Sequence, residues 1–136
     1  MRTTFWIVGL LLLAGCDTGL GVPAGFTATD LDGYWQITSS GGGVNCLTIS
    51  GGIIVDKDGF CDPAWFDYPH DDSRTFVNGD RITFVIDIIF DDGSGFNQSI
   101  YELERQSDGT LAGTYTSSFE RHPDLVYGAT LQRLSR

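Results

Sequence analysis

The sequence predicts an all-β domain, a small antiparallel up-and-down meander or barrel of about eight strands. Apolar and polar residues alternate over most of the chain after Asp30, which is the period of half-buried strands. Glycine-rich turns separate these stretches at short intervals. A sheet that closes on itself leaves no bare edge, so a barrel is favoured, and an open β-roll or small sandwich is the alternative.

An apolar segment at the N-terminus has the layout of an export signal. Arg2 gives a positive start, residues 5–13 are apolar, and Ala14 and Gly15 are small. A bilayer-spanning helix needs about 20 apolar residues, and this stretch is too short for one. We therefore predict a signal peptide over residues 1–15.

The end of this segment, Leu13-Ala14-Gly15-Cys16, resembles the lipobox of bacterial lipoproteins. The resemblance implies that the Cys16 thiol carries diacylglycerol and that the chain is cut before Cys16. An ordinary secretory peptide with a chance cysteine is the alternative. The expected location is the bacterial cell envelope, on the periplasmic side of the inner membrane or on the outer membrane. Asp17 resembles the signal that retains enterobacterial lipoproteins in the inner membrane.

A flexible tether is expected over residues 16–29, because this segment is small, aperiodic and rich in glycine. The folded domain is expected over residues 30–136, with a short turn before Asp30. Without residues 1–15 the chain is long enough for one domain with a modest core.

The charge excludes nucleic acid as a partner. The mature chain, without Arg2, carries seven Lys and Arg against 18 Asp and Glu, a net −11. Lys57 is the one lysine, and the arginines are scattered, so the sequence forms no basic patch. The acidity is typical of a protein kept soluble in an envelope compartment.

Two cysteines remain when Cys16 carries the lipid. Cys46 and Cys61 are expected to form a disulfide, since disulfides persist outside the cytoplasm. Closing a loop of about 15 residues stabilises a fold by roughly 3 kcal/mol. The alternative, a metal site on both cysteines, lacks nearby histidines, because the chain has only His70 and His122.

The first half of the domain is expected to hold three strands. Alternation predicts a strand over residues 33–39. Residues 46–49 and 53–55 then form a hairpin closed at Gly51-Gly52, or else one bulged strand. Residues 56–72 have no alternation and two prolines, which predicts a long loop.

The second half is expected to hold the longest strands. Asn78-Gly79 predicts a hairpin between residues 74–77 and 82–90. Strands follow around residues 97–106, 111–119 and 127–134. The inward positions are nearly all large, so we expect an interior cavity smaller than about 300 Å³. These positions are Trp35, Ile37, Leu47, Ile49, Phe84, Ile86, Ile88, Tyr101, Leu103, Leu111, Tyr115, Phe119 and Leu131.

Two short motifs resemble those of lipocalins and their calycin relatives. Gly33-Tyr34-Trp35 is similar to the Gly-x-Trp motif that opens the first strand of that family. The stretch from Asp108 to Tyr115 is similar to a turn and strand of avidin-type barrels, although it stands elsewhere in the chain. In calycins an arginine of the last strand packs across the tryptophan, and Arg133 is the matching residue. The resemblance implies a barrel closed by Trp35 and Arg133, and it leaves the ligand open.

Two sequence patterns invite a chemical interpretation. Asp56-Lys57-Asp58-Gly59 with Asp62 offers oxygen ligands for calcium, but the distal glutamate of a calcium loop is missing and the pattern is also common in turns. His70 beside Asp71 and Asp72 suggests an oriented base, yet no nucleophile motif accompanies it. We therefore predict no enzyme, no metal and no cofactor.

Aromatic residues gather in the long loop at Phe60, Trp65, Phe66 and Tyr68. Such side chains either contact a partner or ligand, or fold back as a cap over the open end of the barrel. The predicted function is a membrane-anchored, non-enzymatic structural or protein-interaction module, with an envelope protein as partner. The alternative is a lipocalin-like binder of a small apolar or amphipathic ligand.

Overall fold

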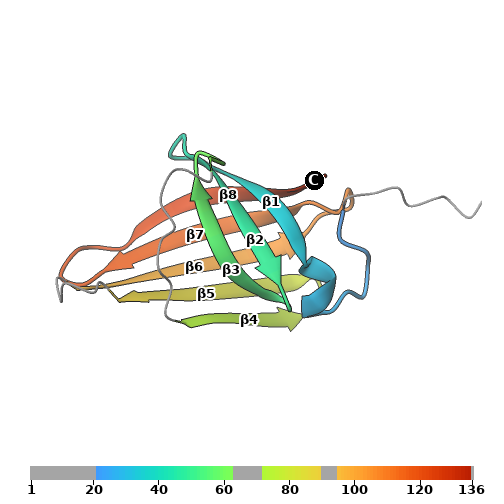
Figure 1. Ribbon diagram of the computed structural model, residues 1–136, viewed down its shortest axis with the longest axis horizontal. Coiled ribbons are helices and arrows are strands. Elements are labelled where there is room, and N and C mark those ends of the chain that lie inside the picture. The colour runs from blue at the N-terminus through green and yellow to red at the C-terminus, as the bar shows by residue number, and fades with distance from the viewer. Residues whose placement is uncertain (1–20, 63–71, 90–94, 136) are drawn as a thin grey trace, which may run out of the picture.

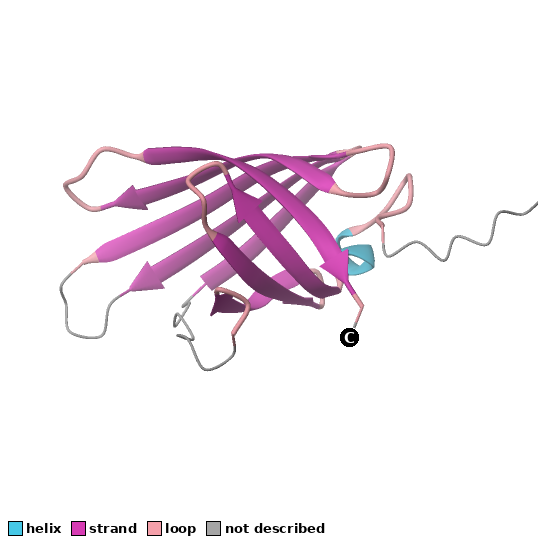
Figure 2. Ribbon diagram, turned by 90° about the horizontal axis from the view of Figure 1, so that it is seen from above, coloured by secondary structure: helices cyan, strands magenta, loops and turns pink. Residues whose placement is uncertain are grey.

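A computed structural model describes residues 21–62, 72–89 and 95–135 as eight antiparallel strands in one sheet. The sheet curls into a nearly closed barrel (Figure 1 and Figure 2). A short 3₁₀ helix, η1 (Ala28–Leu31), precedes it. The strands are β1 (Gly33–Ser39), β2 (Val44–Ser50), β3 (Ile53–Gly59), β4 (Asp72–Asn78), β5 (Arg81–Ile89), β6 (Phe96–Arg105), β7 (Leu111–Phe119) and β8 (Leu125–Leu134).

The strand order is β3-β2-β1-β8-β7-β6-β5-β4, the order of a meander whose first and last strands pair. β1 and β8 are joined through Trp35↔Arg133 and Ile37↔Leu131. β3 and β4 lie at the two edges of the sheet and are in contact, but the described residues form no ladder between them. The expectation of a sheet without any bare edge was therefore wrong at this one seam.

A bulge explains the course of β3. The pairing of β2 with β3 shifts between Thr48 and Ile49, so that Ile49 faces Ile54 while Thr48 faces Asp56. The extra residue, Val55, increases the local twist and turns the strand. Figure 1 shows β3 crossing the front of the molecule obliquely, which takes it away from the direction of β4.

The barrel has two different ends. The closed end holds η1 and the turns β2–β3, β4–β5 and β6–β7, and the opposite end, called the open end here, holds the described β1–β2 and β7–β8 connections. At the closed end the Trp35 indole Nε1 donates a hydrogen bond to the Leu31 carbonyl at 2.8 Å. The Asp32 carboxylate accepts from the backbone N–H groups of Gly51 and Gly52, at 2.9 and 2.7 Å. These bonds tie η1 to the β2–β3 turn.

Part of the segment expected to be a flexible tether, residues 16–29, packs against the barrel. Val22 and Phe26 fall in the range 16–29, and only 2% and 6% of each is exposed. The Val22 N–H donates to the Gly109 carbonyl at 3.0 Å, and the Arg105 Nε donates to the Val22 carbonyl at 2.7 Å. The packed body therefore includes the segment from Val22 onward.

Most local predictions are confirmed. The strands over 33–39 and 111–119 match β1 and β7, and both predicted hairpins are present. Cys46 and Cys61 form the expected disulfide, with a Cα–Cα distance of 4.6 Å.

The loop expected over residues 56–72 was wrong at both ends. β3 continues to Gly59, and β4 begins at Asp72. The bulge at Val55 breaks the alternation of apolar residues, which is why this part of β3 has no strand pattern in the sequence.

Candidate functional site

The interior of the barrel changes from apolar to polar along its axis. Toward the closed end the inward side chains are large and apolar, among them Trp35, Phe84 and Leu131. Toward the open end, buried polar side chains replace them on β6 and β7. These are Asn97, Ser99 and Ser117.

Lys57 points into this polar half. In the β2–β3 ladder it stands opposite Leu47, which is fully buried, and directly opposed residues of an antiparallel pair share a face. The Lys57 Nζ lies 5.2 Å from the centroid of the Tyr115 ring. β3 and β7 are not neighbours in the sheet, so this contact crosses the barrel interior.

Three tyrosines form a row beside Lys57. Tyr101, Tyr115 and Tyr127 stand opposite one another on β6, β7 and β8. The Tyr101 and Tyr115 rings stack with centroids 4.7 Å apart, and those of Tyr115 and Tyr127 with centroids 6.1 Å apart. The row forms an aromatic wall along one side of the interior.

The polar groups enclose a small cavity near the open end. The Ser99 Oγ lies 3.4 Å from both the Asn97 Oδ1 and the Tyr115 hydroxyl, and the Asn97 Nδ2 donates to the Ser117 Oγ at 3.3 Å. The cavity measures about 120 Å³, which agrees with the expectation of an interior space smaller than about 300 Å³. Its lining is Lys57, Ile88, Asn97, Ser99, Tyr115, Ser117 and Phe119.

The two innermost tyrosines are held in different electrostatic environments. Burial raises the pKa of Tyr101 above its ordinary value, although the charge of Lys57 acts against the shift. Burial also opposes ionisation of Tyr115. There, however, the Lys57 charge and hydrogen bonds from Ser99, Ser117 and Lys57 outweigh burial, so the pKa of Tyr115 lies below its ordinary value.

The Tyr101 hydroxyl stands out among the polar atoms of the interior. The residue is completely buried, and no group in the described ranges meets its hydroxyl in hydrogen-bond geometry. Ser73 and Thr75 on β4 are partly buried, and their buried hydroxyl oxygens also have no hydrogen-bond partner in the described ranges; they stand opposite Ile86 and Phe84. A buried hydroxyl without an acceptor costs free energy, and none of these three residues lines the interior cavity.

The closed end carries the contact expected from the calycin resemblance. The Arg133 guanidinium lies over the Trp35 ring, 4.7 Å from its centroid, and donates a hydrogen bond to the Asp30 carbonyl. Gly33 has a φ of +147°, which favours glycine, and a Cβ there would lie in ordinary van der Waals contact with the Arg133 side chain at 3.4 Å. This arrangement fills the closed end.

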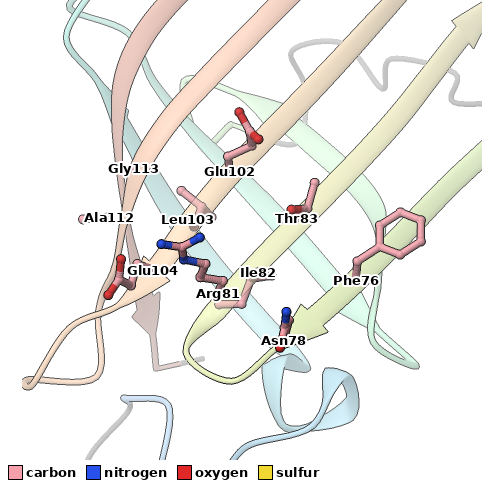
Figure 3. Close-up of a pocket in the computed structure, with 10 residues that line it drawn as sticks. All are labelled: Phe76, Asn78, Arg81, Ile82, Thr83, Glu102, Leu103, Glu104, Ala112 and Gly113. Carbon is pink, nitrogen blue, oxygen red and sulfur yellow. The ribbon is translucent and has the colours of Figure 1, made fainter.

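A larger hollow lies on the outside of the barrel. It measures about 500 Å³ and runs over the outer faces of β4 to β7. Figure 3 shows Phe76, Thr83 and Glu102 spread across an open surface, with Arg81 and Glu104 near the β4–β5 turn. Because these side chains do not converge on one point, the interior cavity is the better candidate site.

The residues considered for calcium take other roles in the structure. Asp56 and Asp58 lie within β3 and not in a loop, and they face outward opposite Thr48 and Cys46. Asp58 is only 5% exposed although it lies on the outer face of the sheet. Its carboxylate accepts a hydrogen bond from the Tyr34 hydroxyl at 3.1 Å. Across the described residues, no cluster of three or more His, Cys, Asp or Glu is placed to hold a metal ion.

Several predicted site residues fall where the structure gives no description. Trp65, Phe66, Tyr68, His70 and Asp71 belong to residues 63–71, outside the described ranges, as does Cys16. Phe60 is described and is 72% exposed beside the disulfide. Phe119 lines the cavity as expected, but it stands at the mouth and is 41% exposed.

Comparison with known proteins gives no relative from which to propose a function, so the proposal below is argued from the structure. No protein-family model matches the chain, and no match was found among curated proteins or solved structures. In the described part of the chain, no helix is long and apolar enough to cross a membrane.

Sequence reasoning missed the polar half of the interior. Continuing the alternation from Tyr101 to Ser99 and Asn97, and from Tyr115 to Ser117, would have placed these side chains inward. Lys57 could not be found in this way, because the bulge at Val55 reverses the alternation along β3.

Proposed function

We propose that the chain is a lipid-anchored envelope protein whose barrel is a non-enzymatic interaction module, with its open end directed away from the membrane. The position of Val22 carries this proposal. Val22 packs at the closed end, against the β6–β7 turn at Gly109. The six residue-to-residue steps from Cys16 to Val22 span at most about 20 Å, so a lipid on Cys16 would hold the closed end near the membrane.

The open end then faces possible partners, and its described rim carries exposed apolar side chains among charged ones such as Glu120 and Arg121. Phe60, Phe96, Phe119, Leu125 and Val126 are exposed around the strand ends and connections there. Exposed apolar groups that gather in one region are typical of protein interaction sites. An envelope protein that covers this rim is the partner we propose.

The anchor is tested by fractionation. Cys16→Ser should move the protein from the membrane to the soluble envelope fraction, because the thiol that accepts the lipid is gone. A serine variant that stays with the membrane would contradict the anchor.

The orientation is tested with a fluorophore on an introduced cysteine, either Ser107→Cys at the closed end or Asp124→Cys at the open end. Both positions are exposed. A quencher in the lipid head groups should quench the probe at residue 107 more strongly than the probe at residue 124. Equal quenching would contradict the proposed orientation.

A second candidate is a lipocalin-like binder of a small amphipathic molecule. The observation that favours it is the interior cavity, which joins a polar lining to the apolar Ile88 and Phe119. Both candidates use the open end. In the first a protein covers the rim from outside, and in the second a small molecule enters the barrel.

A further inference from the structure

We propose that the interior cavity binds a small neutral molecule that carries a hydroxyl group on an apolar body, such as a phenol, with the hydroxyl held among Asn97, Ser99 and Ser117. This inference rests on the second candidate function, ligand binding inside the barrel, and does not depend on the lipid anchor. It adds the chemical class of the ligand, the group that the barrel recognises and the orientation of the bound molecule.

The lining of the cavity is ordered along the barrel axis. Nearest the open end, Ile88, Asn97 and Phe119 stand opposite one another on β5, β6 and β7. The next inward positions on β6 and β7 are Ser99 and Ser117, which face each other across the ladder. A molecule that enters from the open end therefore passes two apolar side chains before it reaches the two serine hydroxyls.

The polar side chains of the lining both donate and accept hydrogen bonds. The Asn97 Nδ2 donates to the Ser117 Oγ at 3.3 Å, and the Asn97 Oδ1 accepts from the Ser99 Oγ at 3.4 Å. Both distances exceed the usual values of about 2.9 Å for N–H···O and 2.7 Å for O–H···O bonds. The amide also uses only one of its two donors and one of its two acceptor positions within the described ranges. A ligand hydroxyl, which donates and accepts, matches this set of groups.

These polar side chains are buried although the fold has apolar alternatives at such positions. Asn97, Ser99 and Ser117 are only 5%, 3% and 6% exposed, whereas the closed half of the same barrel is filled by large apolar side chains. Burying polar groups costs free energy, and two neighbouring serines leave space that larger side chains would fill. Recognition of a ligand therefore explains this cluster better than stability of the barrel does.

The lining favours a neutral ligand over a charged one. The Lys57 ammonium lies 5.2 Å from the centroid of the Tyr115 ring and takes part in further interactions, so its charge is engaged within the protein. A carboxylate only accepts hydrogen bonds, and the Asn97 Oδ1 would face it without a proton between them. A cationic ligand would meet the Lys57 charge. Because burying an ion without compensation is costly, a neutral hydroxyl compound fits best.

The volume of the cavity limits the ligand to about one ring. It measures about 120 Å³, and benzene occupies a protein cavity of roughly 150 Å³. Phe119 is 41% exposed at the mouth, and the Tyr115 ring forms part of the wall. Aromatic rings pack favourably against such side chains, so the ring should lie beside Phe119 with its hydroxyl directed inward.

Three probes of similar size test the class of ligand. Phenol carries the hydroxyl, toluene has a methyl group in its place, and benzoate carries a charge. Binding of each probe to the purified full chain is measured from the NMR shifts of the backbone amides of β5, β6 and β7. We expect phenol to bind with a dissociation constant of about 1 mM or tighter, and toluene and benzoate to bind at least about fivefold more weakly.

Two pairs of variants locate the binding site. Asn97→Leu removes the amide and keeps the size of the side chain, and Gln98→Leu makes the matching change at the next residue, which faces outward. Ser117→Ala and Ser118→Ala form a second pair on β7 that changes the structure less. We expect both inward variants to weaken phenol binding by about fivefold and to leave toluene binding unweakened. Both outward variants should leave the binding of phenol unchanged.

The outcomes distinguish this inference from the function on which it rests. Toluene or benzoate binding as tightly as phenol would overturn the neutral hydroxyl assignment and leave a ligand-binding barrel. Phenol binding that survives both Asn97→Leu and Ser117→Ala, or that falls equally in the outward variants, would mean that phenol binds elsewhere. Absence of binding by all three probes would overturn the ligand-binding function together with the inference.

Discussion

Arg133 covers the Trp35 indole at the closed end, with the guanidinium carbon 4.7 Å from the ring centroid. The two residues are direct partners across the β1–β8 ladder, the pairing that joins the N-terminal strands to the end of the chain. Their contact therefore helps to hold β1 against β8, the pairing that turns the meander into a barrel.

Removing the guanidinium should destabilise the barrel. Arg133→Ala loses the cation–π contact and the hydrogen bond to the Asp30 carbonyl, and we expect a loss of about 1–2 kcal/mol in the free energy of unfolding. Urea denaturation measures this loss. Arg121→Ala, at an exposed position, should change stability by less than about 0.5 kcal/mol. Similar losses in both variants would mean that the contact with Trp35 contributes nothing.

Two strand glycines should respond oppositely to alanine. A Cβ on Gly113 would overlap the Glu102 carbonyl oxygen, whereas the nearest atoms to a Cβ on Gly128 lie 3.7 Å away, on Ser40. Gly113→Ala should therefore destabilise the protein by about 1–3 kcal/mol or more, because backbone of β6 must move. Gly128→Ala should be neutral or stabilising by up to about 1 kcal/mol. Thermal unfolding of both variants tests this contrast.

The Cys46–Cys61 disulfide should contribute to stability through the chain it closes. The two cysteines are 15 residues apart, for which the chain-entropy estimate is roughly 3 kcal/mol. Cys46→Ala with Cys61→Ala should lower the free energy of unfolding by about that amount. Intact mass before and after reduction should differ by two hydrogens, and two free thiols in the native protein would contradict the bond.

The pKa of Tyr115 should report on Lys57. Its folded-state pKa lies below its ordinary value, with the Lys57 charge the leading cause that lowers it against burial. Lys57→Met should therefore raise the pKa of Tyr115. Absorbance titration of tyrosinate, compared with and without Tyr115→Phe, measures it, and an unchanged pKa would contradict the placement of Lys57.

The sign of the accompanying stability change follows from the direction of the shift. Because the folded pKa of Tyr115 is lowered, its contribution to stability is present above the unfolded pKa and is lost as the pH falls through the folded pKa. Tyr101 acts in the opposite direction, since its raised pKa favours the folded state below the unfolded pKa and the benefit is lost as the pH rises.

The strands and turns could be predicted because their signals are local. The bounds of β1 and β7 follow from alternation between glycine-rich turns, and Gly51, Gly52 and Gly79 adopt the positive φ angles that these turns require. The disulfide followed from counting cysteines once Cys16 was assigned to the lipid. None of these inferences needs knowledge of distant contacts.

The candidate site could not be predicted from the sequence, because it depends on contacts between residues that are far apart in the chain. Alternation predicts that Tyr101 and Tyr115 face inward, but Lys57 falls within residues 56–72, for which the sequence predicts a loop. One extra residue at Val55 reverses which side chains of β3 face inward, and a bulge of this kind is set by pairing with β2. The contact of Lys57 with Tyr115 also joins strands that are not neighbours in the sheet.

The sequence by itself therefore determined the all-β class, the strand-and-turn order and the cysteine pair, all of which depend on residues near one another or on composition. Tertiary structure alone decided the unpaired seam between β3 and β4, the packing of Val22 at the closed end and the polar cavity around Lys57. Twist and bulges accumulate around the barrel, and only their sum determines which side chains meet across its interior.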